Sequence, residues 1–324
     1  MRAMRALLRG ALALPIAWGA AALFYTVPAP KGLAGAIAAL FALAGLGALA
    51  FARFGRALGI AGLLLAGVAL WWSQLQPTNG AEWARENART PHGELHGDVL
   101  TLENVRDFDY RSETDFDERW ETRSYDLSKL RGLDLFLSHW GSPAIAHTIL
   151  SWDFEGSRPL AISIETRKDK TQQYSAIAGF FRNYPILYVA ADERDLVRLR
   201  TNYRGESVWL YRLRMPVPRA RALLLDYVAS MNRLVERPAF YNALTENCTT
   251  AIRAHVGKVG GNVPLDWRLL ANGYLDEFLY ERGAVTTSVP FDELKRRGHI
   301  DARAKAADQD PEFSARIRDG LPPR

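Results

Sequence analysis

Three long apolar segments occupy the first quarter of the chain and constrain what it can fold into. They cover residues 7–27, 33–52 and 57–72, and they contain no acidic residue and no basic residue except Arg9. Runs of about 20 apolar residues are long enough to cross the hydrocarbon core of a bilayer as helices. The sequence therefore predicts an anchor of three membrane helices within residues 1–75.

The third segment is the shortest, but Leu75 can extend it, and Trp71 and Trp72 suit the aromatic belt at a membrane surface. The glycine and alanine content of the second segment suits close packing of helices in lipid. A cleaved signal peptide would explain only the first segment, because two more apolar segments follow it. A buried core helix is the alternative for the third segment.

The distribution of lysine and arginine predicts the orientation of the anchor. Three arginines lie at the start of the first segment, and Arg53 and Arg56 lie between the second and third, whereas the first loop holds only Lys31. Because basic loops stay in the cytoplasm, we expect a cytoplasmic N-terminus. Three crossings then place the residues after Pro77 outside, which predicts a bacterial cytoplasmic (inner) membrane protein with a periplasmic C-terminal domain.

The positive charge of the chain belongs to its anchor. Residues 1–75 carry six basic and no acidic side chains, which leaves 35 basic and 36 acidic residues in the remainder. An outer domain close to neutral lacks the basic surface that is typical of nucleic-acid-binding proteins. The sequence therefore indicates the membrane as a partner and no nucleic acid, and it leaves the oligomeric state open.

About 250 residues follow the anchor, enough for one domain with its own core. Residues 76–97 are polar and weakly patterned, so we interpret them as a linker that leads into a domain at 98–324. The pattern predicts an α+β domain with an antiparallel sheet and surrounding helices. Strands are expected at 98–105, 132–141, 147–154, 160–167, 186–190 and 207–212, an acidic loop at 106–120, and helices at 174–183, 193–202, 218–236 and from Cys248 onward.

The clearest hairpin joins residues 147–154 to residues 160–167. Leu150, Trp152 and Phe154 share one face of the first arm, and isoleucines match them on the second arm. Symmetric pairing about the turn would place His147 opposite Arg167. The opposite, polar face of the hairpin would then hold His147, Ser151, Ser163, Glu165 and Arg167.

Cys248 is the only cysteine of the chain, and it stands where a helix is expected to begin. Asn247 is a preferred N-cap residue, with Thr245 as a second choice. Unpaired amides and the helix dipole at a first turn lower the pKa of a thiol, and those of Cys248 and Thr249 could hold an oxyanion. The alternative is a small buried residue, which is how a free cysteine usually behaves.

A thiol nucleophile also needs a base, and the chain has six histidines. His255 lies two turns after Cys248 on the same helix, roughly 10 Å away, which is too far. His92 and His96 are expected in a loop because glycine and proline flank them. His139 and His147 lie at strand ends, and His147 is the better candidate because it shares a face with Glu165, which could orient the ring.

The strings "NVRDFDYRSETDFDERWETRSYDL", "AHTILSWDFEG", "ISIETRKD" and "FYNALTENCTT" together resemble the Lnb-type N-terminal periplasmic domain family. That family is named after a bacterial lipoprotein intramolecular acyltransferase, and the similarity extends from about residue 77 to the C-terminus. The resemblance implies a permuted papain-like (NlpC-type) fold, with histidine before cysteine in the chain. It also implies that Cys248 is the nucleophile, His147 the base, and Glu165 or Ser163 the third polar group.

From these residues we expect an enzyme that transfers or hydrolyses acyl groups of lipids or lipoproteins through a thioester on Cys248. Asn247 and Thr249 would support the helix start and the oxyanion. No metal or organic cofactor is indicated. The alternatives are a cell-wall amidase or peptidase, a non-catalytic envelope module with an inert cysteine, and a dimer linked through Cys248. The arginines between Arg111 and Arg123 are expected on a surface.

Overall fold

The computed structural model describes residues 2–243 and 245–324. The chain divides into two compact units. The first contains the described residues up to Thr78 together with two short segments, residues 173–185 and 239–242. The second contains residues 79–172 and 186–238 and the described residues of 243–324.

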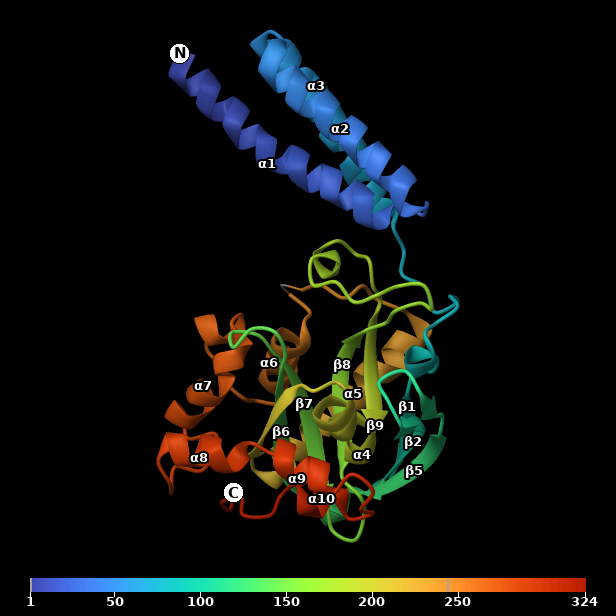
Figure 1. Cartoon of the computed structure of the whole chain (residues 1–324), viewed down its shortest axis with the longest axis vertical. Helices are drawn as coiled ribbons and strands as arrows, with labels where there is room; N and C mark the ends of the chain where they lie inside the picture. Colours follow the sequence, from blue (N-terminus) through green and yellow to red (C-terminus); the bar gives the residue numbers. More distant parts are fainter. Residues whose placement is uncertain (1, 244) are drawn as a thin grey trace. The chain divides into compact units, whose positions relative to one another are not determined.

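Three helices form most of the first unit, and each is long and apolar enough to cross a membrane (Figure 1). They are α1 (Arg2–Thr26), α2 (Lys31–Phe51) and α3 (Phe54–Gln74), which confirms the three predicted helices. Small residues let α1 and α2 approach closely. A Cβ added at Gly19 would lie 2.8 Å from the Phe41 ring, and one added at Gly45 would lie 2.7 Å from Ile16.

Residues 173–185 pack on the membrane helices within the first unit. The Phe181 ring stacks 5.3 Å from the ring of Tyr25, and Arg182 donates to the Trp72 carbonyl at 2.8 Å. The helix predicted at 174–183 is wrong, because only one turn, Ala178–Phe180, is helical. The Tyr184 hydroxyl donates to the carbonyl of Gln173 at 2.8 Å and so closes the segment into a loop.

The second unit is built on an eight-stranded mixed sheet, so the predicted α+β class is confirmed. Its strands follow the order β1-β2-β9-β8-β7-β6-β10, and β5 also pairs with β2. The predicted purely antiparallel sheet is wrong in one place, because β2 and β9 run parallel. The strands are β1 (His92–His96), β2 (Val99–Arg106), β5 (Trp120–Asp126), β6 (Leu130–His139), β7 (Ala146–Phe154), β8 (Leu160–Thr166), β9 (Ile186–Ala191) and β10 (Ser207–Leu213); β3 (Asp109–Tyr110) and β4 (Phe116–Asp117) form a separate short hairpin.

Helices cover both faces of this sheet and bury two separate apolar cores (Figure 1). The larger core lies under α5 (Val217–Glu236) and α6 (Cys248–Lys258), with α7 (Leu275–Glu281) and α8 (Phe291–Gly298) at its side. The smaller core lies under α4 (Glu193–Arg198), α9 (Asp301–Ala306) and α10 (Phe313–Arg316). A π-helical turn, Leu199–Tyr203, continues α4.

The β7–β8 hairpin keeps the predicted faces but not the predicted register. Ile149 lies opposite Ser163, and Ser151 lies opposite Ala161, so pairing is shifted by two residues from the expected partners. Gly156 causes the shift, because its φ of 72° places the centre of the turn at this residue. An even shift leaves every side chain on its predicted face. The polar face with His147 is therefore retained.

One strand, β1, lies where a loop was expected, and another, β5, lies almost wholly where no element was predicted. His92–His96 forms β1, because Gly93 lets the strand lie under α5: a Cβ there would lie 3.4 Å from Val228 and 2.5 Å from Leu102. Trp120–Asp126 forms β5 although it is rich in charge. Arg123 pairs with Glu121 at 2.6 Å, so the charges are matched along the strand.

Trp152 anchors the larger core, and its replacement by alanine tests the packing of the second unit. The side chain is fully buried, and its Nε1 donates to the Ala220 carbonyl at 2.8 Å. We expect Trp152→Ala to lower the free energy of unfolding by about 3–5 kcal/mol, measured by urea unfolding in detergent micelles. Trp140 is 39% exposed, so Trp140→Ala is the control, expected within about 0.5 kcal/mol of wild type. Equal losses in both variants would contradict this packing.

Candidate functional site

Cys248 is the first residue of α6, where backbone amides lack partners within the helix. The side chain of Asn247 accepts hydrogen bonds from the amides of Thr249 and Thr250, each at 2.9 Å, and Thr250 Oγ1 accepts one from the Asn247 amide at 3.0 Å. The predicted N-cap at Asn247 is therefore confirmed. The same cap engages the Thr249 amide, so that amide is not free to hold an oxyanion.

Asn272 joins the start of α6 to the start of β7, and the sequence analysis missed it. Its Nδ2 donates to the Ala146 carbonyl at 2.6 Å and to Thr249 Oγ1 at 2.7 Å, and its Oδ1 accepts from the Ala146 amide at 2.8 Å. The same Nδ2 lies 3.8 Å from the sulfur of Cys248. The buried side-chain amide of Asn272 thus fixes the position of Ala146, which precedes His147, and of the helix start at Cys248.

The backbone around Asn272 leaves no room for a larger neighbour. A Cβ added at Gly273 would lie 2.0 Å from the carbonyl oxygen of Pro143. The His139 ring donates from Nε2 to the Gly273 carbonyl at 3.1 Å. This bond joins the end of β6 to the segment that carries Asn272. The only signal in the sequence was the Asn-Gly pair, which indicates a turn but not the strand that it contacts.

His147 lies near the start of β7, and its ring connects to two other predicted residues. Its Nε2 lies 2.6 Å from Ser163 Oγ and 3.1 Å from Glu165 Oε1. Ser163 Oγ donates to Glu165 Oε1 at 2.6 Å. Because the single serine proton goes to the carboxylate, the serine oxygen accepts from the ring N–H. In the neutral ring, this arrangement places the proton on Nε2. Nδ1 of His147 is then the nitrogen that can accept a further proton.

Behind this chain lies a cation that the sequence analysis also missed. Arg200 is buried in the π-helical turn, and its Nη2 donates to Glu165 Oε1 at 2.8 Å. Its Nε lies 3.7 Å from Glu206, which accepts from Ser138 Oγ at 2.5 Å. Ser138 and His147 are partners across the β6–β7 pair. The carboxylate of Glu165 is therefore held from two sides, by a hydroxyl and by a guanidinium.

The electrostatics of these groups favour a thiolate facing a protonated ring. Burial lowers the pKa of His147, but the Glu165 carboxylate and a hydrogen bond with Cys248 outweigh it and raise the pKa to about 9. Burial raises the pKa of Cys248, but the hydrogen bond with His147 and its charge bring the pKa below its usual value. Burial also raises the pKa of Glu165, yet His147 and Arg200 hold it well below its usual range.

The other histidines are engaged elsewhere. On α6, the ring of His255 accepts from the Tyr188 hydroxyl at 2.6 Å and donates to Asp226. His92 and His96, on β1, each lie within 3.4 Å of a carboxylate. Among the residues that the structure describes, no three histidine, cysteine or acidic side chains are grouped as a metal site would require. His255, His92 and His96 are therefore engaged with groups other than Cys248.

The arginine-rich segment before β6 forms ion pairs. Arg111 pairs with Asp115 and with Asp117, each at 2.7 Å, on an exposed surface. Arg123 is more buried and pairs with Asp192 at 3.1 Å. The predicted surface role is confirmed for Arg111, whereas Arg123 joins β5 to the residue that caps α4.

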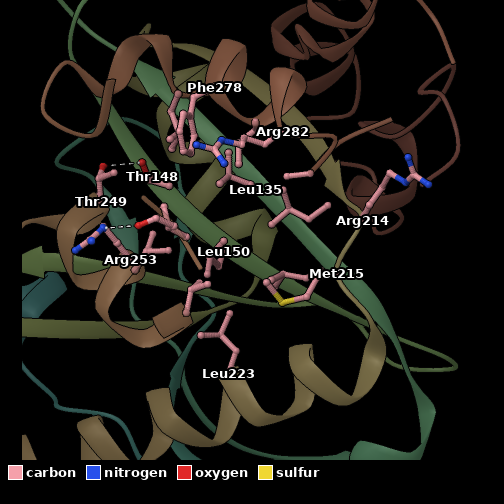
Figure 2. Close-up of a pocket in the computed structure, with 18 of the residues that line it drawn as sticks. Leu135, Thr148, Leu150, Arg214, Met215, Leu223, Thr249, Arg253, Phe278 and Arg282 are labelled. Carbon is pink, nitrogen blue, oxygen red and sulfur yellow. Dashed lines mark hydrogen bonds between the residues drawn. The ribbon is translucent and has the colours of Figure 1, made fainter. Parts of the chain in front are cut away.

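A cavity of about 410 Å³ is lined by the residues that directly follow the two candidate residues in the chain, and not by His147 or Cys248 themselves (Figure 2). Thr148 and Thr249 line one side of it, and their hydroxyls lie 3.4 Å apart. Each follows a candidate residue directly in the chain, His147 or Cys248. Thr249 Oγ1 lies 3.8 Å from the sulfur. The cavity therefore extends from the neighbourhood of the thiol into the larger core.

Residues 116–273 match the family model described as the Lnb N-terminal periplasmic domain. The match covers Cys248 and His147 together with their partners Ser163, Glu165, Arg200 and Asn272. No curated protein and no solved structure matched the chain. Together with the three apolar helices, the family match supports an inner-membrane protein with a periplasmic domain.

The thiol of Cys248 should react well below its usual pKa, and the reactivity should depend on His147. Because the chain has one cysteine, the rate of alkylation by iodoacetamide reports this thiol alone. In His147→Ala the hydrogen bond and the positive charge are lost while burial remains, so the pKa rises. We expect the alkylation rate at pH 7 to fall by about tenfold or more and the midpoint to move to higher pH.

The matched control is His96→Ala, because 77% of that side chain is exposed. This variant should keep the wild-type pH profile of alkylation. An unchanged profile in His147→Ala, or a wild-type midpoint at or above the usual thiol value, would contradict the pairing of the two groups.

Proposed function

Because residues 116–273 belong to the Lnb N-terminal periplasmic domain family, we propose that this chain is a membrane-anchored, cysteine-dependent acyltransferase or hydrolase. Its substrates would be acyl groups of lipids or lipoproteins, carried as a thioester on Cys248. The observation that carries the proposal is the hydrogen-bonded group of His147, Ser163 and Glu165, together with the lowered pKa of Cys248, which His147 causes. Such a chain supplies a nucleophile, a base and a group that orients the base.

In the proposed reaction Nδ1 of His147 takes the proton of the Cys248 thiol. The sulfur attacks the carbonyl carbon of an ester, a C–S bond forms, and the C–O bond of the ester breaks. The imidazolium returns the proton to the leaving alcohol. Water or an acceptor alcohol or amine then attacks the thioester, which completes hydrolysis or transfer and regenerates the thiol.

Glu165 stabilises the imidazolium, and Ser163 transmits this effect through its hydroxyl. Arg200 keeps the carboxylate ionised, because a guanidinium at 2.8 Å favours the charged form. We assign the oxyanion to the first turn of α6, with the amide of Cys248 itself as the first donor. Asn247 supports this turn through its cap, and Thr249 through its bond to Asn272.

The proposal includes the arrangement of the chain at the membrane. Residues 1–75 would form the anchor, with the N-terminus in the cytoplasm, residues 76–97 the lead-in, and 98–324 the periplasmic catalytic domain. The fold of that domain would be a permuted papain-like (NlpC-type) fold, with His147 before Cys248. A helix that begins at the nucleophile and packs on a sheet strand that carries the base supports this assignment.

The alternatives are weighed by the same contacts. Cys248 is only 7% exposed, which argues against a dimer linked through this residue. A non-catalytic envelope module would not need a buried guanidinium and a half-buried carboxylate behind its histidine, because removing charges from water is costly. A cell-wall amidase would use the same residues, and the largely apolar cavity beside Thr249 favours an acyl ester over a peptide.

The test of this function is acylation of Cys248 by a small activated ester, p-nitrophenyl butyrate. We expect the intact mass of the protein to rise by one butyryl group, and hydroxylamine to remove it. Cys248→Ala should lose the adduct, and His147→Ala should slow its formation by about 10²–10⁴-fold. Comparison of Glu165→Gln with Ser163→Ala identifies which of the two orients the ring.

His96→Ala is again the control and should acylate at the wild-type rate. Two outcomes would contradict the proposal. One is an adduct of the same mass in Cys248→Ala, and the other is the absence of any adduct on wild-type protein under conditions that acylate another thiol enzyme.

A further inference from the structure

The cavity beside the candidate site has walls suited to an apolar chain. Side chains from β6, β7, α5 and α7 form these walls, including Leu135, Leu150, Leu223 and Phe278, and Met215 lies among them (Figure 2). Its volume of about 410 Å³ lies within the range of small-molecule sites. Because the lining is mostly aliphatic, water molecules in the cavity would find few hydrogen-bond partners. Binding of an acyl chain would instead remove apolar surface from water, which is favourable.

Four arginines also line this cavity, namely Arg214, Arg219, Arg253 and Arg282, and no aspartate or glutamate does. Within the part of the chain that the structure describes, none of the four forms a salt bridge with a carboxylate. The nearby acids Asp266 and Glu281 are held by Arg268, at 3.0 Å and 2.7 Å. The cavity therefore combines an apolar interior with guanidinium groups that form no direct ion pair among the described residues.

The positive charge and the thiol lie close together along α6. Arg253 follows Thr249 by one helical turn, so the two side chains share a face of the helix. Its Nε donates to the Val263 carbonyl at 2.8 Å, which fixes the guanidinium and leaves its other nitrogens as donors. A ligand with its apolar part in the cavity would thus place its polar part at Arg253, on the side of the cavity that Thr249 lines (Figure 2).

We propose that this cavity binds an anionic phospholipid, with one acyl chain inside and the phosphate at the arginines, and that this lipid is the acyl donor to Cys248. The second half of this statement rests on the proposed function. The sulfur of Cys248 forms a bond to the ester carbonyl carbon, and the carbon–oxygen bond of that ester breaks. The lysophospholipid leaves as an alcohol with the proton held by His147, and the acyl group stays on sulfur.

A phospholipid fits these observations better than a free fatty acid. Both have an apolar chain and an anionic group, but only the phospholipid carries an ester carbonyl between the two, which a thiol can attack. Its phosphate also matches the fork of donors on a guanidinium, which binds two oxygens at once. A neutral lipid would leave four positive charges without a partner.

The binding half of the proposal is tested in full-length Cys248→Ala protein, so that no turnover interferes. Native mass spectrometry in a neutral detergent measures the affinity for dioleoyl phosphatidylglycerol, for dioleoyl phosphatidylcholine and for oleate. We expect phosphatidylglycerol to bind about tenfold more tightly than phosphatidylcholine or oleate. Arg253→Gln combined with Arg282→Gln should remove this preference, and Met215→Trp, which fills the cavity, should weaken binding of both phospholipids.

The matched control is Arg237→Gln, an exposed arginine at the end of α5 that lies outside the cavity. It should leave all affinities unchanged. Equal affinities for the two phospholipids, tighter binding of oleate, or unchanged binding after Met215→Trp would each overturn the proposal.

The donor half is tested in wild-type protein by release of lysophosphatidylglycerol together with an oleoyl adduct on Cys248. If p-nitrophenyl butyrate acylates Cys248 but phosphatidylglycerol does not, the choice of donor is wrong and the proposed function stands. If neither ester acylates Cys248 while phosphatidylglycerol still binds selectively, the proposed function fails and the binding site stands.

Discussion

The candidate site depends on the side chain of Asn272, which ties the first turn of α6 to the first residues of β7. Its amide bonds to both backbone groups of Ala146 and to the hydroxyl of Thr249. Those residues precede His147 and follow Cys248 directly, so the bonds set how the ring and the thiol face each other. A buried amide with every bond satisfied gives one arrangement rather than several.

The charges of the site explain why that arrangement needs so many partners. Glu165 and Arg200 lie in a part of the domain where unpaired charges would be costly, and each neutralises the other at 2.8 Å. Ser163 bridges the carboxylate and the ring, which also lie 3.1 Å apart directly. The result is an imidazole with a raised pKa beside a thiol with a lowered one. Acyl chemistry is a use that fits this charge distribution.

Local patterns in the sequence predicted most elements of the fold. Apolar length predicted the three membrane helices, and alternation predicted the β7–β8 hairpin and its polar face. The register differs from the prediction by two residues because the turn is centred on Gly156 and not on Ser157. The helix expected at 174–183 is a loop, because Tyr184 closes it through contacts that no local periodicity encodes. His147, Ser163 and Glu165 could be grouped from one hairpin, whereas Asn272 and Arg200 reach the site from distant segments and left no signal in the pattern.

The pairing of the one thiol with one imidazole is the central claim, and ultraviolet titration of the thiolate tests it most directly. The difference in absorbance between wild-type and Cys248→Ser protein, followed against pH, isolates the ionisation of this sulfur. The account predicts thiolate absorbance that persists below the usual pKa of a cysteine and that moves upward in pH when the imidazole is removed. A thiol that ionises only above its usual pKa, with or without the imidazole, would contradict it.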